Sequence, residues 1–129
     1  MFMKRILALG GLLLVLVSCE KEKIYRDDSE RLRGMEQEIL AFIQDKACQS
    51  ERVCGSIAFG SKPCGGPWKY LVYSLKTADV ARLEEKVQSY NQLEKEVNTR
   101  EGKISDCVQV TPVTVDCIDG QCLPYTVKD

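Results

Sequence analysis

The sequence contains no histidine, which removes the commonest general base and the usual Ser and Cys triads. No two cysteines have the C-x-x-C spacing of zinc sites and thioredoxin-like redox motifs. Basic residues are not in excess, since 18 Lys and Arg stand against 19 Asp and Glu, so the chain lacks the electrostatic footprint of a nucleic-acid-binding protein. Its acidic residues fall in no recognisable catalytic spacing. We therefore predict no catalytic residues, no metal site, no cofactor and no nucleic-acid partner, and a protein that is not an enzyme.

A long apolar run is also missing. The N-terminal run, residues 6–17, would make a helix of about 18 Å, well short of the ~30 Å hydrocarbon core of a bilayer. It follows a short basic start that carries Lys4 and Arg5. This combination is typical of a cleavable signal peptide rather than of a membrane span.

The apolar run ends in Leu16-Val17-Ser18-Cys19 instead of an Ala-x-Ala-like cleavage site. This ending resembles the lipobox that signal peptidase II cuts in bacterial lipoproteins. The resemblance covers residues 1–19 and implies that residues 1–18 are removed. It also implies that Cys19 becomes the mature N-terminus, carrying diacylglycerol on its sulfur and a further acyl chain, such as palmitate, on its nitrogen. The alternative is an ordinary signal peptide followed by an incidental cysteine.

Such acylation would make the lipid bilayer a partner of the chain through Cys19, since two or more acyl chains give stable membrane attachment. Removing residues 1–18 leaves 111 residues with 16 basic and 19 acidic side chains, a net charge of −3. Residues 19–28 are then the lipidated N-terminus and a charged tether. Glu20 is not the aspartate that retains some lipoproteins at the inner membrane. The prediction is therefore a cell-envelope protein, at the outer membrane in preference to the inner, with the leaflet and surface exposure left open.

Residues 29–129 are predicted to form a single disulfide-rich α+β domain. Two stretches carry the three- and four-residue apolar spacing of amphipathic helices. The first helix is expected over residues 29–47, with an apolar stripe at Leu32, Met35, Ile39, Phe42 and Ile43. The second is expected over residues 78–100, with Thr77 as its N-cap, Gly102 at its end and a buried face at Val80, Leu83, Val87, Tyr90 and Val97.

Strands are expected over residues 53–59 and 68–75, because a Gly- and Pro-rich segment separates two apolar runs. The C-terminal part alternates apolar and polar residues from Val108 on, and Asp119-Gly120 predicts a tight hairpin. The expected fold is thus a small antiparallel sheet with two helices, stabilised by disulfides.

Six cysteines remain after Cys19, and an even number in a small exported chain indicates a disulfide framework. Six cysteines allow fifteen pairings, and the sequence cannot choose among them rigorously. Cys117 and Cys122 should lie opposite each other in the C-terminal hairpin, within bridging range. If the second helix returns to the tip of the first hairpin, Cys64 can reach Cys107. The remaining pair is then Cys48–Cys54.

The segment from Lys62 to Trp68 is the candidate contact surface, because loops on rigid scaffolds often carry function. Its candidate residues are Lys62, Pro63, Gly65, Gly66 and Trp68. The alternative is a disulfide-pinned turn with Trp68 in the core. We predict a non-catalytic binding or interaction module with an unknown protein partner. The competing hypothesis is an inhibitor of an envelope or host hydrolase that acts through this loop, although Lys62-Pro63 would be a poor scissile bond.

Overall fold

A computed structural model describes residues 26–125. Its residue contacts fall into two compact units, with the boundary between Arg33 and Gly34. Residues 26–33 are helical and mostly exposed. The packing contacts that define the fold lie within the unit that begins at Gly34. The predicted signal peptide, Cys19 and the tether up to residue 25 lie outside the described residues. Within residues 26–125, no helix is both long enough and apolar enough to cross a membrane.

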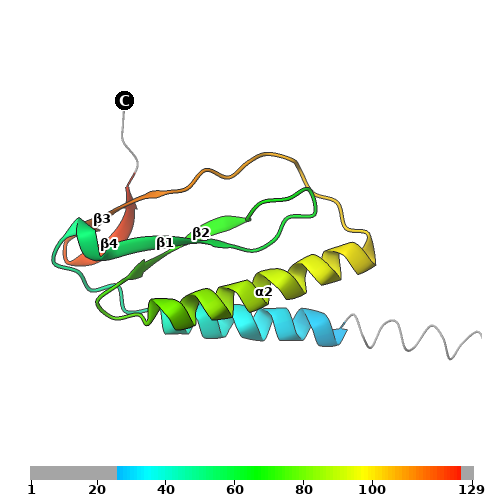
Figure 1. Cartoon of the computed structure of the whole chain (residues 1–129), viewed down its shortest axis with the longest axis horizontal. Helices are drawn as coiled ribbons and strands as arrows, with labels where there is room; N and C mark the ends of the chain where they lie inside the picture. Colours follow the sequence, from blue (N-terminus) through cyan, green and yellow to red (C-terminus); the bar gives the residue numbers. More distant parts are fainter. Residues whose placement is uncertain (1–25, 126–129) are drawn as a thin grey trace, which may run out of the picture. The chain divides into compact units, whose positions relative to one another are not determined.

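The fold is α+β, as the sequence predicted. A helix ends at residue 42 and is followed by the short 3₁₀ helix η1 (Glu51–Val53), the strands β1 (Cys54–Phe59) and β2 (Lys69–Ser74), and the long helix α2 (Val80–Glu101). The chain then runs without regular secondary structure to β3 (Thr114–Ile118) and β4 (Gln121–Tyr125). Figure 1 shows the β1–β2 hairpin with α2 on one side and the irregular segment on the other.

The strands form two separate two-stranded antiparallel sheets rather than the single small sheet we expected. In the first, the register runs from Cys54 opposite Ser74 to Phe59 opposite Lys69. In the second, Asp119 and Gly120 both have positive φ, as a tight two-residue hairpin turn requires. We call the Cys54–Ser74 end of the first hairpin the open end and residues 60–68 the tip.

The first helix stops at residue 42, five residues before its predicted end. Residues 46–48 instead pair with the turn of the second hairpin and the first residues of β4. The Cys48 N–H donates to the Gly120 carbonyl at 3.0 Å, and the Cys122 N–H donates to the Lys46 carbonyl at 2.8 Å. Main-chain pairing with a distant hairpin therefore replaces the last helical turn that local propensity favours.

Helix α2 begins two residues later than predicted, because Asp79 and not Thr77 caps it. The Asp79 carboxylate accepts the Arg82 N–H at 3.1 Å, while the Thr77 hydroxyl donates to the Asp45 carbonyl. Gly102 ends the helix in the left-handed conformation, as predicted. The predicted buried face is confirmed at Leu83, Val87, Tyr90 and Val97.

The larger part of the core lies where α2, the first helix and the β1–β2 hairpin contribute buried side chains. Leu83 is fully buried, and the rings of Phe59 and Tyr90 stack with centroids 4.3 Å apart. Burial raises the pKa of Tyr90 to about 12, with nearby Glu94 as a further cause. Ile39 and Ile43 are the buried members of the predicted stripe, and Met35 and Phe42 are half-buried. Periodicity thus identified the faces that meet.

A second, smaller apolar cluster closes the open end. Cys48, Val72 and Cys122 are its buried members, and five half-buried side chains pack on them: Val53, Cys54, Val113, Val115 and Cys117. Two disulfides cross this cluster, Cys48–Cys117 and Cys54–Cys122, with sulfur–sulfur distances of 2.05 Å. Both bridges fasten the second hairpin to the chain around the start of β1.

The predicted pairs Cys48–Cys54 and Cys117–Cys122 are therefore wrong. Cys117 and Cys122 do lie opposite each other in the β3–β4 register. Because opposite residues present their side chains on the same face, both sulfurs point toward the cluster and each meets a cysteine of another segment. The hairpin is thereby fixed to the domain instead of being closed on itself.

The third predicted pair, Cys64–Cys107, is present, with Cα atoms 5.4 Å apart. The geometric premise behind it also holds, because α2 starts near the open end and ends near the tip (Figure 1). Residues 103–113, which we call the strap, then pass the tip and return to β3. The bridge ties the strap to the tip.

Candidate functional site: the groove between the tip and the strap

Main-chain hydrogen bonds within the loop give the tip a defined shape. The Lys62 N–H donates to the Gly66 carbonyl at 2.8 Å, and the Gly65 N–H donates to the Lys62 carbonyl at 2.9 Å. Gly65 and Gly66 have φ values of 103° and 80°, a region that other residues rarely adopt. The Gly-Gly pair therefore permits a tight, exposed turn between Lys62 and Trp68.

Three polar side chains of α2 hold the tip from below. The Gly60 N–H donates to Asn91 Oδ1 at 2.7 Å, the Ser61 N–H donates to Glu94, and Asn98 Nδ2 donates to the Ser61 carbonyl at 2.7 Å. The three lie on the tip-facing side of the helix at helical spacing. They satisfy main-chain groups that a strand would otherwise have paired. The sequence analysis did not predict this role. The polar residues on the apolar side of the helix were the signal from which it could have been predicted.

Glu94 contacts both arms of the tip, at Ser61 and at Trp68. Burial raises the pKa of the Glu94 carboxyl above its ordinary value of 4.5, and hydrogen bonds from the Ser61 N–H and the Trp68 side chain oppose that rise. Gly60 leaves room for the indole, because a Cβ there would lie 2.4 Å from Trp68 Cδ1. Trp68 is nevertheless 43% exposed, so it is not the core residue of the alternative prediction.

Lys62 is 7% exposed and belongs to the framework of the tip rather than to its outer surface. Its Nζ donates to Asp106 Oδ1 at 2.6 Å and to the Val108 carbonyl at 2.8 Å, and lies 5.4 Å from the centre of the Trp68 ring. The Lys62 ammonium lowers the pKa of the Asp106 carboxyl. A buried ammonium needs such partners. The side chain thus fastens the strap to the tip, next to the disulfide.

A groove of about 560 Å³ lies between the tip and the strap. One wall is the tip from Cys64 to Pro67, the other is the strap from Cys107 to Pro112, and Tyr70 of β2 completes the lining. The lining residues are Cys64, Gly65, Gly66, Pro67, Tyr70, Cys107, Gln109, Val110, Thr111 and Pro112. The Cys64–Cys107 bridge joins the two walls covalently, so the width of the groove at that point is set by the bridge.

Two of the five predicted contact residues line the groove, and the other three do not. Gly65 and Gly66 line the groove, Lys62 fastens it, and Pro63 and Trp68 are not among its lining residues. The strap side of the groove was not predicted. Cys107 was the only signal in the sequence that this segment would face the tip.

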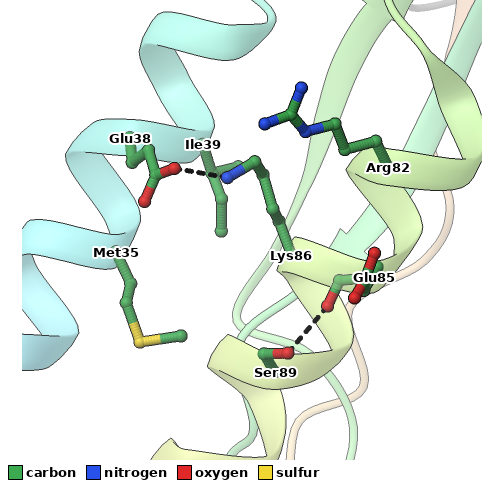
Figure 2. A pocket seen from close by; sticks show the side chains of 7 residues that line it. All are labelled: Met35, Glu38, Ile39, Arg82, Glu85, Lys86 and Ser89. Carbon is green, nitrogen blue, oxygen red and sulfur yellow. Dashed lines mark hydrogen bonds and ion pairs between the residues drawn. The ribbon is translucent and has the colours of Figure 1, made fainter.

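A second hollow, of about 390 Å³, lies between the first helix and α2 (Figure 2). Glu38 and Lys86 form an ion pair across it, and the guanidinium of Arg82 and the ammonium of Lys86 each lie 5.9 Å from the Phe42 ring. The hydrogen bond from Lys86 lowers the pKa of Glu38. The acidic and basic side chains that line this hollow compensate one another, so we interpret the hollow as part of the packing interface between the two helices. A third hollow, of about 410 Å³, lies between β1 and α2.

The sulfurs of Cys48, Cys54 and Cys122 lie within 4.8 Å of one another, the kind of grouping that could hold a metal. Each of the three is bonded in a disulfide, however, so none is available as a thiolate. The cluster is structural. Of the three hollows, the groove beside the tip has the largest volume and is the one without a charged lining residue, so we take it as the candidate ligand site.

No protein-family model matches the chain, and no curated protein or solved structure is detectably similar to it.

Proposed function

We propose that the chain is a bacterial lipoprotein, anchored at the cell envelope through acylated Cys19, whose extracytoplasmic domain binds a partner protein without catalysing a reaction. The outer membrane is its proposed location. Support for the anchor comes from the order of basic start, short apolar run and Leu16-Val17-Ser18-Cys19. Support for the binding role comes from the groove between the tip and the strap.

The observation that carries the binding role is that this groove is both exposed and rigidly framed. Its volume lies within the range of about 300–1,000 Å³ that is usual for ligand pockets. The Cys64–Cys107 bridge, the Lys62–Asp106 pair and the contacts from α2 fix its walls before any partner arrives. Preorganised walls lower the entropic cost of binding. Exposed apolar surface lies nearby, since Val108 is 69% exposed and Trp68 43%.

The anchor is tested by replacing Cys19 with serine in the full chain. Loss of the thiol should block incorporation of a labelled fatty acid and leave an uncleaved precursor. Lipid labelling and membrane fractionation of the variant that match those of the native chain would rule out Cys19 as the anchor.

The binding role is tested in intact cells with a photo-crosslinking amino acid at position 111, inside the groove. The matched control carries the same amino acid at position 114, also an exposed threonine but outside the groove. Discrete adducts from position 111 and none from position 114 are the expected result. Equal adducts from both positions, or none from 111, would refute a partner at the groove.

The position of Lys62 restricts which residues could contact a hydrolase under the inhibitor hypothesis. A trypsin-like target would need an accessible basic side chain, and Lys62 is buried in an ion pair. An inhibitor acting through this loop would therefore have to present Gly65, Gly66 and Trp68.

A further inference from the structure

The strap wall of the groove includes main-chain groups that pair with no other group in the part of the chain that the structure describes. Within residues 26–125, no hydrogen bond joins the main chain of residues 109–111 to any other group. Val108 differs, because its carbonyl accepts from Lys62 and its N–H bonds the Asp106 carboxylate. Gln109 and Thr111 are exposed and Val110 is half-buried. An exposed run of unpaired N–H and C=O groups is a template on which another extended chain can pair.

The groove is also electrically neutral. None of its ten lining residues is acidic or basic, and both cysteines are bonded to each other. The adjacent charges of Lys62 and Asp106 compensate each other. A charged group entering the groove would lose hydration without finding a counter-charge, which is unfavourable. An uncharged ligand is therefore the complementary one.

From these two observations we infer that the groove holds an uncharged, extended peptide segment of the partner, paired in the manner of an added β-strand with residues 109–111. This inference rests on the proposed binding function and names the kind of ligand. The pairing edge is short, because Val108 is fastened by the Lys62–Asp106 pair at one end and Pro112 lacks an N–H at the other. Main-chain pairing supplies affinity, and the neutral lining supplies selection against charge.

The test uses the full chain, purified in detergent, and a display library of short random peptides. Selected peptides should be depleted in Asp, Glu, Lys and Arg near their centre. Thr111→Glu places a charge in the groove and should weaken binding of a selected peptide by about tenfold or more. Thr114→Glu, the matched exposed threonine outside the groove, should leave the affinity unchanged.

A second measurement alters the ligand instead of the protein, so its result does not depend on how a variant folds. N-methylation of alternate amides of a selected peptide should abolish binding when the methyl groups lie on the strap-facing edge. Methylation of the other set should be tolerated, because strand pairing uses every second amide on one edge. Equal loss from both sets, or peptides that bind Thr111→Glu unchanged, would overturn the inference.

Failure of this inference differs from failure of the proposed function. If crosslinks form at position 111 in cells but the library yields no peptide that binds the groove, the partner is recognised as a folded surface and strand pairing is excluded. If no crosslinks form at position 111, the binding function itself is refuted.

Discussion

The two ends of the first hairpin are stabilised in different ways. At the open end, two disulfides cross an apolar cluster, and Cys122 is fully buried. At the tip, a single bridge joins two exposed cysteines, and the remaining contacts are polar: an ion pair, main-chain turns and three side chains of α2. The open end therefore behaves as an extension of the core, whereas the tip is a rigid surface. A small chain can keep an exposed groove rigid in this way without burying it.

The largest effect should come from removing both bridges of the open end with Cys48→Ala, Cys54→Ala, Cys117→Ala and Cys122→Ala. Loop-closure entropy gives about 4 kcal/mol for the first bridge. The second adds about 3 kcal/mol, because it then closes a loop of only about 11 residues. We expect a free energy of unfolding lower by about 7 kcal/mol in denaturant titration, with the β3–β4 hairpin detached. A loss below that of the tip bridge would contradict the comparison.

Removing the tip bridge with Cys64→Ala and Cys107→Ala should cost about 4 kcal/mol, since the bridge spans 43 residues. The apolar cluster and α2 are untouched, so the domain should stay folded. Hydrogen exchange should accelerate in the strap and remain slow in α2. Faster exchange across the whole of α2 would show that the tip bridge also supports the core.

A smaller, asymmetric effect is expected at the Lys62–Asp106 pair. Asp106→Asn leaves the buried Lys62 ammonium without its counter-charge, whereas Lys62→Met removes that charge and keeps the aliphatic stem. Asp106→Asn should therefore lower the free energy of unfolding more than Lys62→Met. The pKa of Asp106 is lowered, so its contribution is complete above the ordinary value of 3.8 and is lost as the pH falls through the lowered pKa. Denaturant titrations of both variants at neutral pH test the asymmetry, and titrations of the native protein down to acidic pH test the pH dependence. Equal losses of unfolding free energy in the two variants would contradict the asymmetry.

The smallest effect should be that of Glu94→Gln. Burial raises the pKa of Glu94, so its protonated form favours the folded state, and that contribution is lost as the pH rises through the raised pKa. The glutamine variant should lack this decline while keeping an oxygen for the Ser61 N–H. Glu96→Gln, on an exposed position of the same helix, is the control and should retain it. Identical pH profiles for all three proteins would show that Glu94 is not desolvated.

The secondary structure was largely predictable because its signals are local. The spacing of Leu83, Val87 and Tyr90 gives a buried helix face, and Asp119-Gly120 gives a hairpin turn. The end of the first helix and two of the disulfides were not predictable. Both depend on the second hairpin meeting residues 46–48, about 70 positions earlier, and no local pattern encodes that contact.

The site was predictable only on one side. Glycine and proline marked the tip, because few other residues permit its main-chain conformation. In the strap only Cys107 gave a signal, because the position of the strap is fixed by the contacts of Asp106, Cys107 and Val108 with Lys62 and Cys64 of the tip. For the same reason, the apolar pattern of α2 concealed Asn91, Glu94 and Asn98, whose contacts only appear once the tip is placed against the helix.

The long span of the open-end bridges bears on the order in which the chain can mature. If the chain crosses a membrane N-terminus first, Cys48 and Cys54 reach the oxidising side well before Cys117 and Cys122. During that interval the cysteines already on the oxidising side are Cys64, Cys19 until it is acylated, and Cys107 at the end, and none of these is a native partner of Cys48 or Cys54. Any bond that they form early is non-native and must be exchanged later by attack of a thiolate. The connectivity thus makes correct oxidation a late event, and a disulfide isomerase would increase the yield of the native protein.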